Sequence, residues 1–248
     1  MTQHTFAFFA PEYIISPAQL HVRFAITKKG PLGLTDLFHR LIHVVRVSLG
    51  QKIMLFDAQY HWEVVVEQIE AKKIVVELIA IHTNIILQPR ITLFLPLLKK
   101  DDLSQAIADA VQVGVTDIQL VVTERTQRKW QGISELERLV RIGVATAEQC
   151  KQFAVPTIAE PLSLQAALGV YKNSTKIICR VDGVSTLDLL SDMQNSTHIV
   201  LIIGPEGDFT SQEYSMLEQE GKSMRLTPTV LKSATVAGLS VGVIRSLI

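Results

Sequence analysis

Apolar runs that alternate with helical patterns restrict most of this chain to an α/β fold. Residues 176–181 and 199–203 read as continuous apolar strands, which is typical of a parallel sheet buried on both faces. Residues 91–98 and 117–122 predict two further strands. Because helical patterns separate these strands, the sequence predicts a domain in which strands and helices alternate.

Capping signals mark where the predicted helices begin. Asp102 offers an N-cap and Gln105 occupies the reciprocal position, ahead of a helix that ends at Gly114. Ser134 and Glu137 form a second capping box of the same kind. We therefore expect one helix after each of the first two strands of this domain.

The first 80 residues follow a different pattern, without a long amphipathic helix. Residues 36–45 fit a short helix at most. Segments rich in Val and Ile predict three strands: residues 52–56, 62–68 and 73–79. A polar stretch at 82–90 looks like a linker, so the sequence predicts a small β-barrel domain at 1–82 and an α/β domain at 83–248.

The formal net charge of zero conceals a basic segment. The whole chain has 24 Lys and Arg against 24 Asp and Glu, which argues against a nucleic-acid partner. Between His21 and Lys52, however, the sequence contains six Lys and Arg residues and only one acidic residue, Asp36. Such a local excess attracts phosphates because salt screens charges beyond about 8–10 Å. The alternative is a solvated barrel surface with incidental lysines.

The remaining composition predicts a cytoplasmic protein without a metal site. The two cysteines, Cys150 and Cys179, lie far apart and lack metal-ligand spacing, as expected of thiols in a reducing compartment. The N-terminal sequence lacks the basic region of a signal peptide. Apolar residues make up 48%, but every apolar run is shorter than the roughly 20 residues that a membrane span needs.

A glycine-rich turn follows the apolar strand at 199–203. In Gly204-Pro205-Glu206-Gly207 the chain turns at the carboxyl end of a buried strand, where backbone amides can reach a ligand. Thr210 and Glu213 then form a capping box for a helix that ends at Gly221. A purely structural turn remains an alternative for this segment.

The tail of the chain contains a second loop. Residues 224–226 predict a short strand, and residues 227–235 lead from it into a helix with Gly238, Ser240 and Gly242. Small side chains allow close approach of this helix to another segment. Two loops at one end of an α/β domain suggest a composite ligand pocket.

Five motifs, in order along the chain, resemble those of the bacterial 16S rRNA (uracil-N3) methyltransferases of the SPOUT superfamily. Residues 204–207 resemble its GPEG signature, and residues 226–235 are similar to its LGxRxLRxET loop. The other matches are Glu124-Arg125, Ala147-Glu148-Gln149-Cys150 with Val155-Pro156, and His43-Val44-Val45-Arg46 with Gly50.

The resemblance implies a fold, a cofactor and a reaction. Residues 1–82 would form a PUA-like β-barrel that binds RNA, and residues 83–248 a SPOUT domain with a C-terminal deep trefoil knot. The implied cofactor is S-adenosyl-L-methionine (SAM), with no metal. The implied protein is a cytoplasmic homodimer that methylates N3 of one uridine in 16S rRNA of the small ribosomal subunit.

The resemblance also implies the site residues. Arg125, Glu206 and Lys232 are the expected catalytic residues, because uracil N3 reacts only after losing its proton and cationic donors stabilise the resulting charge. For Glu206 the alternative is that it only favours the positive end of the following helix. The expected RNA-binding residues are Arg23, Arg40, His43, Arg46 and Arg125. The expected SAM-binding residues are Ile203, Gly204, Pro205, Glu206, Gly207, Leu226, Val230, Leu231, Lys232, Ala234 and Thr235.

The sequence departs from the family pattern near the expected site. At Asp208 the family has glycine, and at Lys232 it has arginine, which binds planar anions differently. The departures, most of them at positions charged in the family, are Asp109, Gln112, Gln152, Asp208, Thr229, Lys232 and Ala234. Two alternatives therefore stay open: a SAM-dependent methyltransferase with another RNA target, and an RNA-binding or ribosome-assembly factor without turnover.

Overall fold

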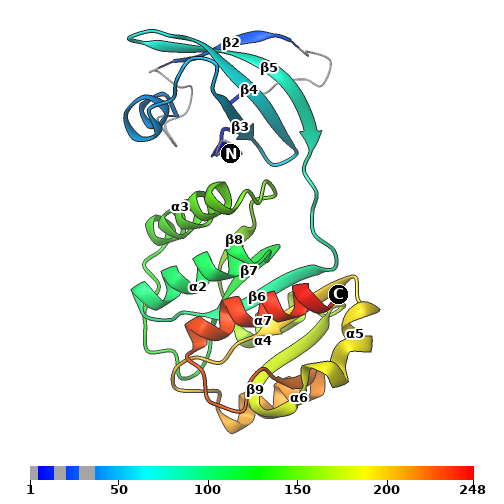
Figure 1. Ribbon diagram of the computed structural model, residues 1–248. Coiled ribbons are helices and arrows are strands. Elements are labelled where there is room, and N and C mark those ends of the chain that lie inside the picture. The colour runs from blue at the N-terminus through cyan, green and yellow to red at the C-terminus, as the bar shows by residue number, and fades with distance from the viewer. Residues whose placement is uncertain (1–4, 14–20, 28–36) are drawn as a thin grey trace. The chain divides into compact units, whose positions relative to one another are not determined.

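The structure, a computed structural model, describes residues 5–13, 21–27 and 37–248. The chain forms two compact units (Figure 1). The first contains Met1–Ile85 and Glu148–Ala154, and the second contains Ile86–Ala147 and Val155–Ile248. The sequence predicts a boundary after residue 82, and the division in the structure follows residue 85. The sequence gives no sign that residues 148–154 belong with the first unit.

The first unit contains a five-stranded, mostly antiparallel sheet in the order β1-β3-β4-β5-β2, in which only β1 and β3 pair in parallel. Alternate residues of β4, namely Trp62, Val64 and Val66, are fully buried, as expected for a sheet with one face in a core. Its elements are β1 (Phe6–Phe9), β2 (Arg23–Thr27), α1 (Leu37–His39), η1 (Arg40–Val45), β3 (Lys52–Phe56), β4 (Tyr60–Ile69) and β5 (Lys73–Thr83). The three predicted strands are confirmed, whereas β1 and β2 are not predicted.

The predicted short helix at 36–45 is found over residues 37–45 as one α-helical turn followed by a π-helix. The C-cap residue of the π-helix is Arg46, whose φ of 56° lies in the left-handed region. Asp36, Lys28 and Lys29 lie outside the described residues. The basic segment is therefore described only in part.

The second unit contains a parallel sheet of six strands in the order β11-β9-β10-β6-β7-β8. Its strands are β6 (Arg90–Pro96), β7 (Asp117–Val122), β8 (Thr157–Ser163), β9 (Thr175–Ser185), β10 (His198–Ile202) and β11 (Lys222–Arg225). Its helices are α2 (Lys100–Gln112), α3 (Ile133–Cys150), α4 (Leu164–Val170), η2 (Thr186–Leu189), α5 (Leu190–Gln194), α6 (Ser211–Glu220) and α7 (Ser233–Leu247). The predicted α/β class is confirmed, although β8, α4 and α5 are not predicted.

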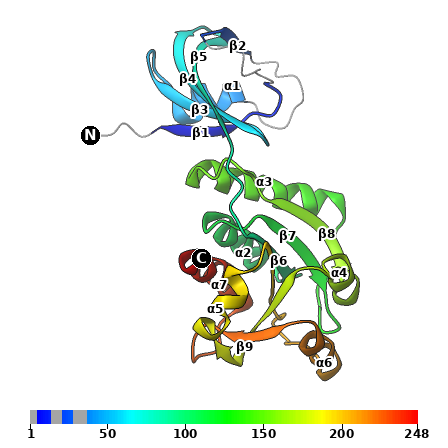
Figure 2. The same ribbon diagram turned by 90° about the vertical axis from the view of Figure 1, so that its right-hand side faces the viewer.

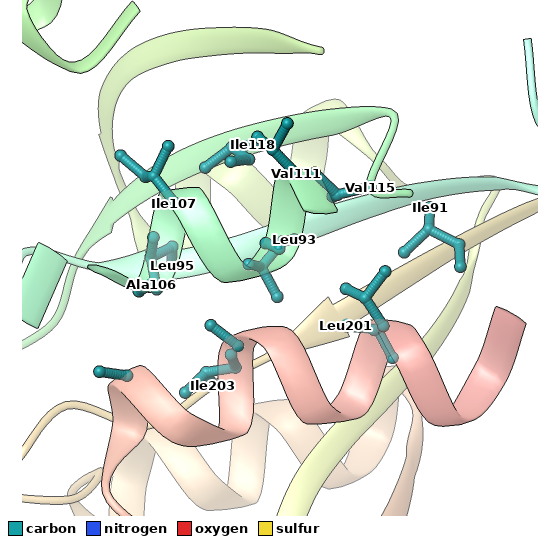
Figure 3. Close-up of a cluster of buried hydrophobic side chains, with 14 of the residues drawn as sticks. Ile91, Leu93, Leu95, Ala106, Ile107, Val111, Val115, Ile118, Leu201 and Ile203 are labelled. Carbon is teal, nitrogen blue, oxygen red and sulfur yellow. The ribbon is translucent and has the colours of Figure 1, made fainter. Parts of the chain in front are cut away.

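Helices cover both faces of this sheet, which explains why its strands are apolar throughout. Figure 2 shows α2, α5 and α7 on one side and α4 and α6 on the other. Along β10, Ile199 and Leu201 join the core under α2 and α7, while Val200 and Ile202 join the core under α4 and α6. Figure 3 shows the larger core, in which Leu93 and Leu201 lie between the sheet and the helices α2 and α7. No helix within residues 5–13, 21–27 and 37–248 is long and apolar enough to cross a membrane.

Two of the three predicted capping boxes are wrong. Helix α2 begins at Lys100, so Asp102 lies inside its first turn, and Gln105 donates to Asp109 Oδ1 instead of to a cap amide. Helix α3 begins at Ile133, before Ser134. In both cases the helix begins before the predicted capping residue. Acidic side chains in the first turns, Asp102 of α2 and Glu135 of α3, still interact favourably with the helix dipoles. The box formed by Thr210 and Glu213 on α6 is confirmed.

Helix α7 packs closely against α2 because small side chains face the contact. A Cβ atom added at Gly238 would lie 2.7 Å from the Cβ atom of Asp109. Ser240 is completely buried, and a Cβ atom at Gly242 would meet Val113 at 3.4 Å. The small residues of the tail helix therefore serve helix packing.

We predict that Gly238→Ala lowers the free energy of unfolding by about 1–3 kcal/mol, because the added methyl group overpacks the contact with α2. Gly169→Ala is a matched control, since no atom lies within 4 Å of a Cβ atom added at this position in α4. The control should be neutral or more stable by up to about 1 kcal/mol because alanine favours helix. Chemical denaturation measures both. Equal effects of the two substitutions would contradict the packing account.

Candidate functional site

A cavity of about 640 Å³ lies at the carboxyl-terminal side of the parallel sheet, where α/β proteins usually bind ligands. Four segments form most of its lining. The turn after β10 and the tail loop that leads from β11 into α7 contribute most of the residues, and the segment after β6 and residues 179–182 within β9 contribute most of the others. Asp102 of α2 and Tyr214 of α6 also line the cavity. The two loops that the sequence suggests as a composite pocket therefore do border one cavity.

Nine of the predicted SAM-binding residues line this cavity: Ile203, Gly204, Pro205, Glu206, Leu226, Val230, Leu231, Lys232 and Ala234. The other two, Gly207 and Thr235, do not line it. A Cβ atom at Gly207 would face the Arg125 side chain at 3.4 Å, and Thr235 is exposed on the first turn of α7. The roles of these residues in binding stay predictions.

A hydrogen bond joins the two loops. The Ser233 hydroxyl donates to the Gly204 carbonyl oxygen at 2.6 Å, from the first residue of α7 to the first residue of the glycine-rich turn. Ser233 is not among the predicted site residues, although a serine at the start of a helix is a common capping residue. Here its hydroxyl fixes the separation of the cavity walls instead.

Glu206 lines the cavity and contacts the start of α2. Its Oε1 atom accepts a long hydrogen bond of 3.4 Å from the backbone amide of Lys99, the N-cap residue of that helix. A carboxylate at this position interacts favourably with the positive end of the helix dipole. The helix that Glu206 supports is therefore α2, whereas the alternative in the sequence analysis assigned it to the helix that follows, α6.

The three predicted catalytic residues are only partly brought together. Lys232 is exposed and lines the cavity with Glu206. Arg125 does not line it, and its Nη1 atom donates to the carbonyl oxygens of Gly207 at 2.8 Å and Phe209 at 3.3 Å. Arg125 therefore braces the glycine-rich turn in this structure.

A polar cluster that the sequence analysis does not assign to the site forms one wall of the cavity. Arg180 pairs with Asp182 at 2.7 Å, and its guanidinium lies 4.1 Å from the ring centre of Tyr214. The Tyr214 hydroxyl donates to Asp208 Oδ1 at 2.5 Å. Burial, followed by this hydrogen bond, raises the pKa of Tyr214 above its ordinary value. A charged residue at the end of an apolar strand is the signal that could have identified Asp182.

Acidic partners offset part of the predicted basic surface of the first unit. Arg23 pairs with Glu67 at 2.7 Å, and Arg40 pairs with Glu148 of the same unit at 2.5 Å. These partners lie outside the segment between His21 and Lys52, so a local charge count misses them. The Arg23–Glu67 pair is more exposed than the Arg40–Glu148 pair, in which Glu148 is buried, and in each pair the carboxylate offsets the charge of the arginine.

His43 and Arg46 remain exposed near each other on the π-helix and its cap. The His43 ring lies 4.7 Å from the His39 ring, centre to centre. No ion pair of Arg46 occurs among the described residues. Of the predicted RNA-binding residues of this unit, these two are exposed and have no ion pair among the described residues.

Comparison with known proteins decides the family. The RNA methyltransferase domain family matches residues 87–245 of this chain. The chain belongs to this family. Ribosomal RNA small subunit methyltransferase E from Rickettsia conorii is 30% identical over 163 residues, 63% of this chain and 64% of that protein. The protein of the same name from Mesomycoplasma hyopneumoniae is 27% identical over 208 residues, 82% of this chain and 89% of its own length.

Solved structures of other proteins share the fold of this chain over nearly its whole length. Ribosomal RNA small subunit methyltransferase E from Neisseria gonorrhoeae, bound to S-adenosyl methionine, has a TM-score of 0.83 at 22% identity and covers 98% of both chains. A Legionella pneumophila protein in complex with bound SAM has a TM-score of 0.82 at 21% identity, again over 98% of both chains. The family that the five motifs predict is confirmed, with distant relatives of the methyltransferase E type over most of the chain.

We predict unequal alkylation of the two cysteines. Burial raises the pKa of the Cys179 thiol to about 12, against a weaker opposing effect of a hydrogen bond with Ser240. Because a raised pKa keeps the thiol protonated at pH 8, iodoacetamide should label the exposed Cys150 and leave Cys179 unlabelled. Peptide mass spectrometry measures both sites. Labelling of Cys179 as fast as Cys150 at pH 8 would contradict the raised pKa of the Cys179 thiol.

Proposed function

We propose that the protein transfers a methyl group from SAM to N3 of a specific uridine in 16S rRNA of the small ribosomal subunit. The observation that carries the proposal is the cavity bordered by residues 204–208 and 226–234 and closed by the hydrogen bond from Ser233 to Gly204. It lies in the domain that matches the RNA methyltransferase family. The relatives named small subunit methyltransferase E, one of them bound to S-adenosyl methionine, support the substrate and the cofactor.

The cavity suits a nucleoside cofactor. A volume of about 640 Å³ lies in the usual range for ligand sites, roughly 300–1,000 Å³. Leu98, Leu226, Leu231 and Val236 supply apolar surface for a base, while the turn at 204–208 supplies backbone polar groups. When bound, SAM would supply an electrophilic methyl group on a positively charged sulfur.

The side chains at the cavity then have distinct tasks. Lys232 would stabilise the negative charge that develops on the uracil oxygens as N3 loses its proton. Arg125, through its bonds to two carbonyl oxygens, would hold the turn in place and face RNA with its remaining donors. Glu206 would fix the turn relative to α2. Alignment of the donor and N3 supplies much of the remaining acceleration.

Further parts of the proposal concern assembly. The turn at 204–208 and the tail loop would be loops of a deep trefoil knot. The protein would act in the cytoplasm as a homodimer without a metal. The first unit would be a PUA-like barrel that binds rRNA through His43 and Arg46. The described residues contain no group of three or more His, Cys, Asp and Glu side chains that could hold a metal ion.

The direct test is the methylation state of 16S rRNA in cells that lack the gene. We expect mass spectrometry to show the loss of one N3-methyluridine and its return when the gene is restored. A Lys232→Ala gene should restore little of the modification, because the charge at the cavity is lost. Retention of the N3-methyluridine in the deletion strain would contradict the proposal, and loss of a different methylated nucleotide would favour another RNA target.

We also predict a difference between two arginines in RNA binding. Arg46→Ala should weaken binding to 16S rRNA and reduce the slope of log K against log salt by about 1, because one phosphate contact is lost. Arg23→Ala is the matched control and should change the slope less, since Glu67 already pairs with Arg23. Filter binding at several salt concentrations measures both. Equal slopes for wild type and Arg46→Ala would contradict RNA contact at the π-helix.

A further inference from the structure

Asp208 occupies a backbone conformation that glycine normally adopts. Its φ is 59°, in the left-handed region, and the family resemblance predicts glycine at this position. Aspartate tolerates this conformation better than most residues because its side chain can bond to nearby backbone. Here Oδ1 accepts hydrogen bonds from the Phe209 amide at 2.9 Å and from the Tyr214 hydroxyl at 2.5 Å. The carboxylate is therefore held in one position at the cavity wall.

The charge of Asp208 is not offset by a direct cationic partner. Both of its hydrogen-bond donors are neutral groups, and no ion pair of Asp208 occurs among the described residues. Asp182, on the same wall, differs because two of its oxygens bind Arg180. Asp208 therefore presents a fixed negative charge without a direct cationic partner, although Lys99, Arg180 and Lys232 also line the cavity.

The size of the cavity makes this charge relevant to any bound molecule. A spherical cavity of about 640 Å³ is roughly 11 Å across, so its centre lies about 5 Å from the wall, within the Debye length of about 8 Å at physiological salt. A charge on a ligand inside it thus lies within range of Asp208. Methyl transfer changes that charge: the carbon–sulfur bond breaks, sulfur keeps the electron pair, and the positive sulfonium becomes a neutral thioether. The methyl carbon bonds to N3, whose proton passes to solvent.

We propose that Asp208 is a specificity-determining residue that makes the cavity prefer the positively charged methyl donor over its neutral product. The inference rests on the proposed function, because it assumes that SAM and S-adenosylhomocysteine bind in this cavity. Tyr214 is the positioning residue that holds the carboxylate. The preference reduces product inhibition, since the ligand loses an attractive interaction as soon as it loses its methyl group.

Calorimetry with SAM and with S-adenosylhomocysteine on the full-length chain tests the proposal. Asp208→Asn keeps the shape of the side chain and removes its charge, and it should weaken SAM binding about three- to tenfold, as expected for one charge in a partly solvated site. Binding of S-adenosylhomocysteine should change by less than about twofold. Asp208→Gly suits the positive φ and removes the same charge, so it should give the same change in the ratio of the two affinities.

Asp192→Asn is the matched control. Asp192 carries the same charge in the same unit, but it does not line this cavity and pairs with Lys222. The ratio of affinities should equal that of the wild type. An equal loss of both ligands in Asp208→Asn and Asp208→Gly, or an unchanged ratio, would overturn the inference and leave the proposed function intact. A wild-type chain that binds neither ligand would overturn both.

Discussion

The close contact between α7 and α2 determines where the tail loop ends, and the cavity depends on it. Gly238 allows α7 to approach Asp109 of α2, and α7 starts directly after the tail loop at Ser233. The same placement brings the Ser233 hydroxyl to 2.6 Å from the Gly204 carbonyl. Without the small residues on α7 the helix would move away from α2, and the two walls of the cavity would separate. Packing of a helix thus sets the geometry of a ligand site.

Charges in the two units are arranged in different ways. In the first unit, the arginines at 23 and 40 each pair with a glutamate, so these two charges are already partnered. Around the cavity of the second unit, four carboxylates, at 102, 182, 206 and 208, stand against three cationic side chains, Lys99, Arg180 and Lys232. The surplus is negative, which suits a positively charged methyl donor. The neutral total of the chain reveals neither arrangement.

The sequence predicts the elements whose signal is local. Buried strands such as β7 match their predicted bounds because an apolar run covered on both faces has few alternatives. The strands β1 and β2 and the helix α4 are short and depend on tertiary contacts, so their segments carry little periodicity. The first capping box fails because Asp102 looks like an N-cap in the sequence, while the fold starts α2 two residues earlier.

The same distinction holds at the site. Two loops at one end of the domain are visible as motifs, and the structure places them around one cavity. The wall formed by Arg180, Tyr214 and Asp208 comes from β9, α6 and the turn between β10 and α6, which approach each other only in the folded sheet. The bond from Arg125 to Gly207 spans 82 residues of chain and has no local signal. Long-range contacts of this kind require the structure.

The central claim is that the turn at 204–208 and the tail loop at 226–234 form one SAM site. An experimental structure of this chain with bound SAM tests it most directly. The account predicts that the ligand contacts both loops, lies between the carboxyl ends of β9 and β10, and leaves the hydrogen bond from Ser233 to Gly204 intact. A ligand that contacts only one of the two loops, or that binds elsewhere on the chain, would contradict it.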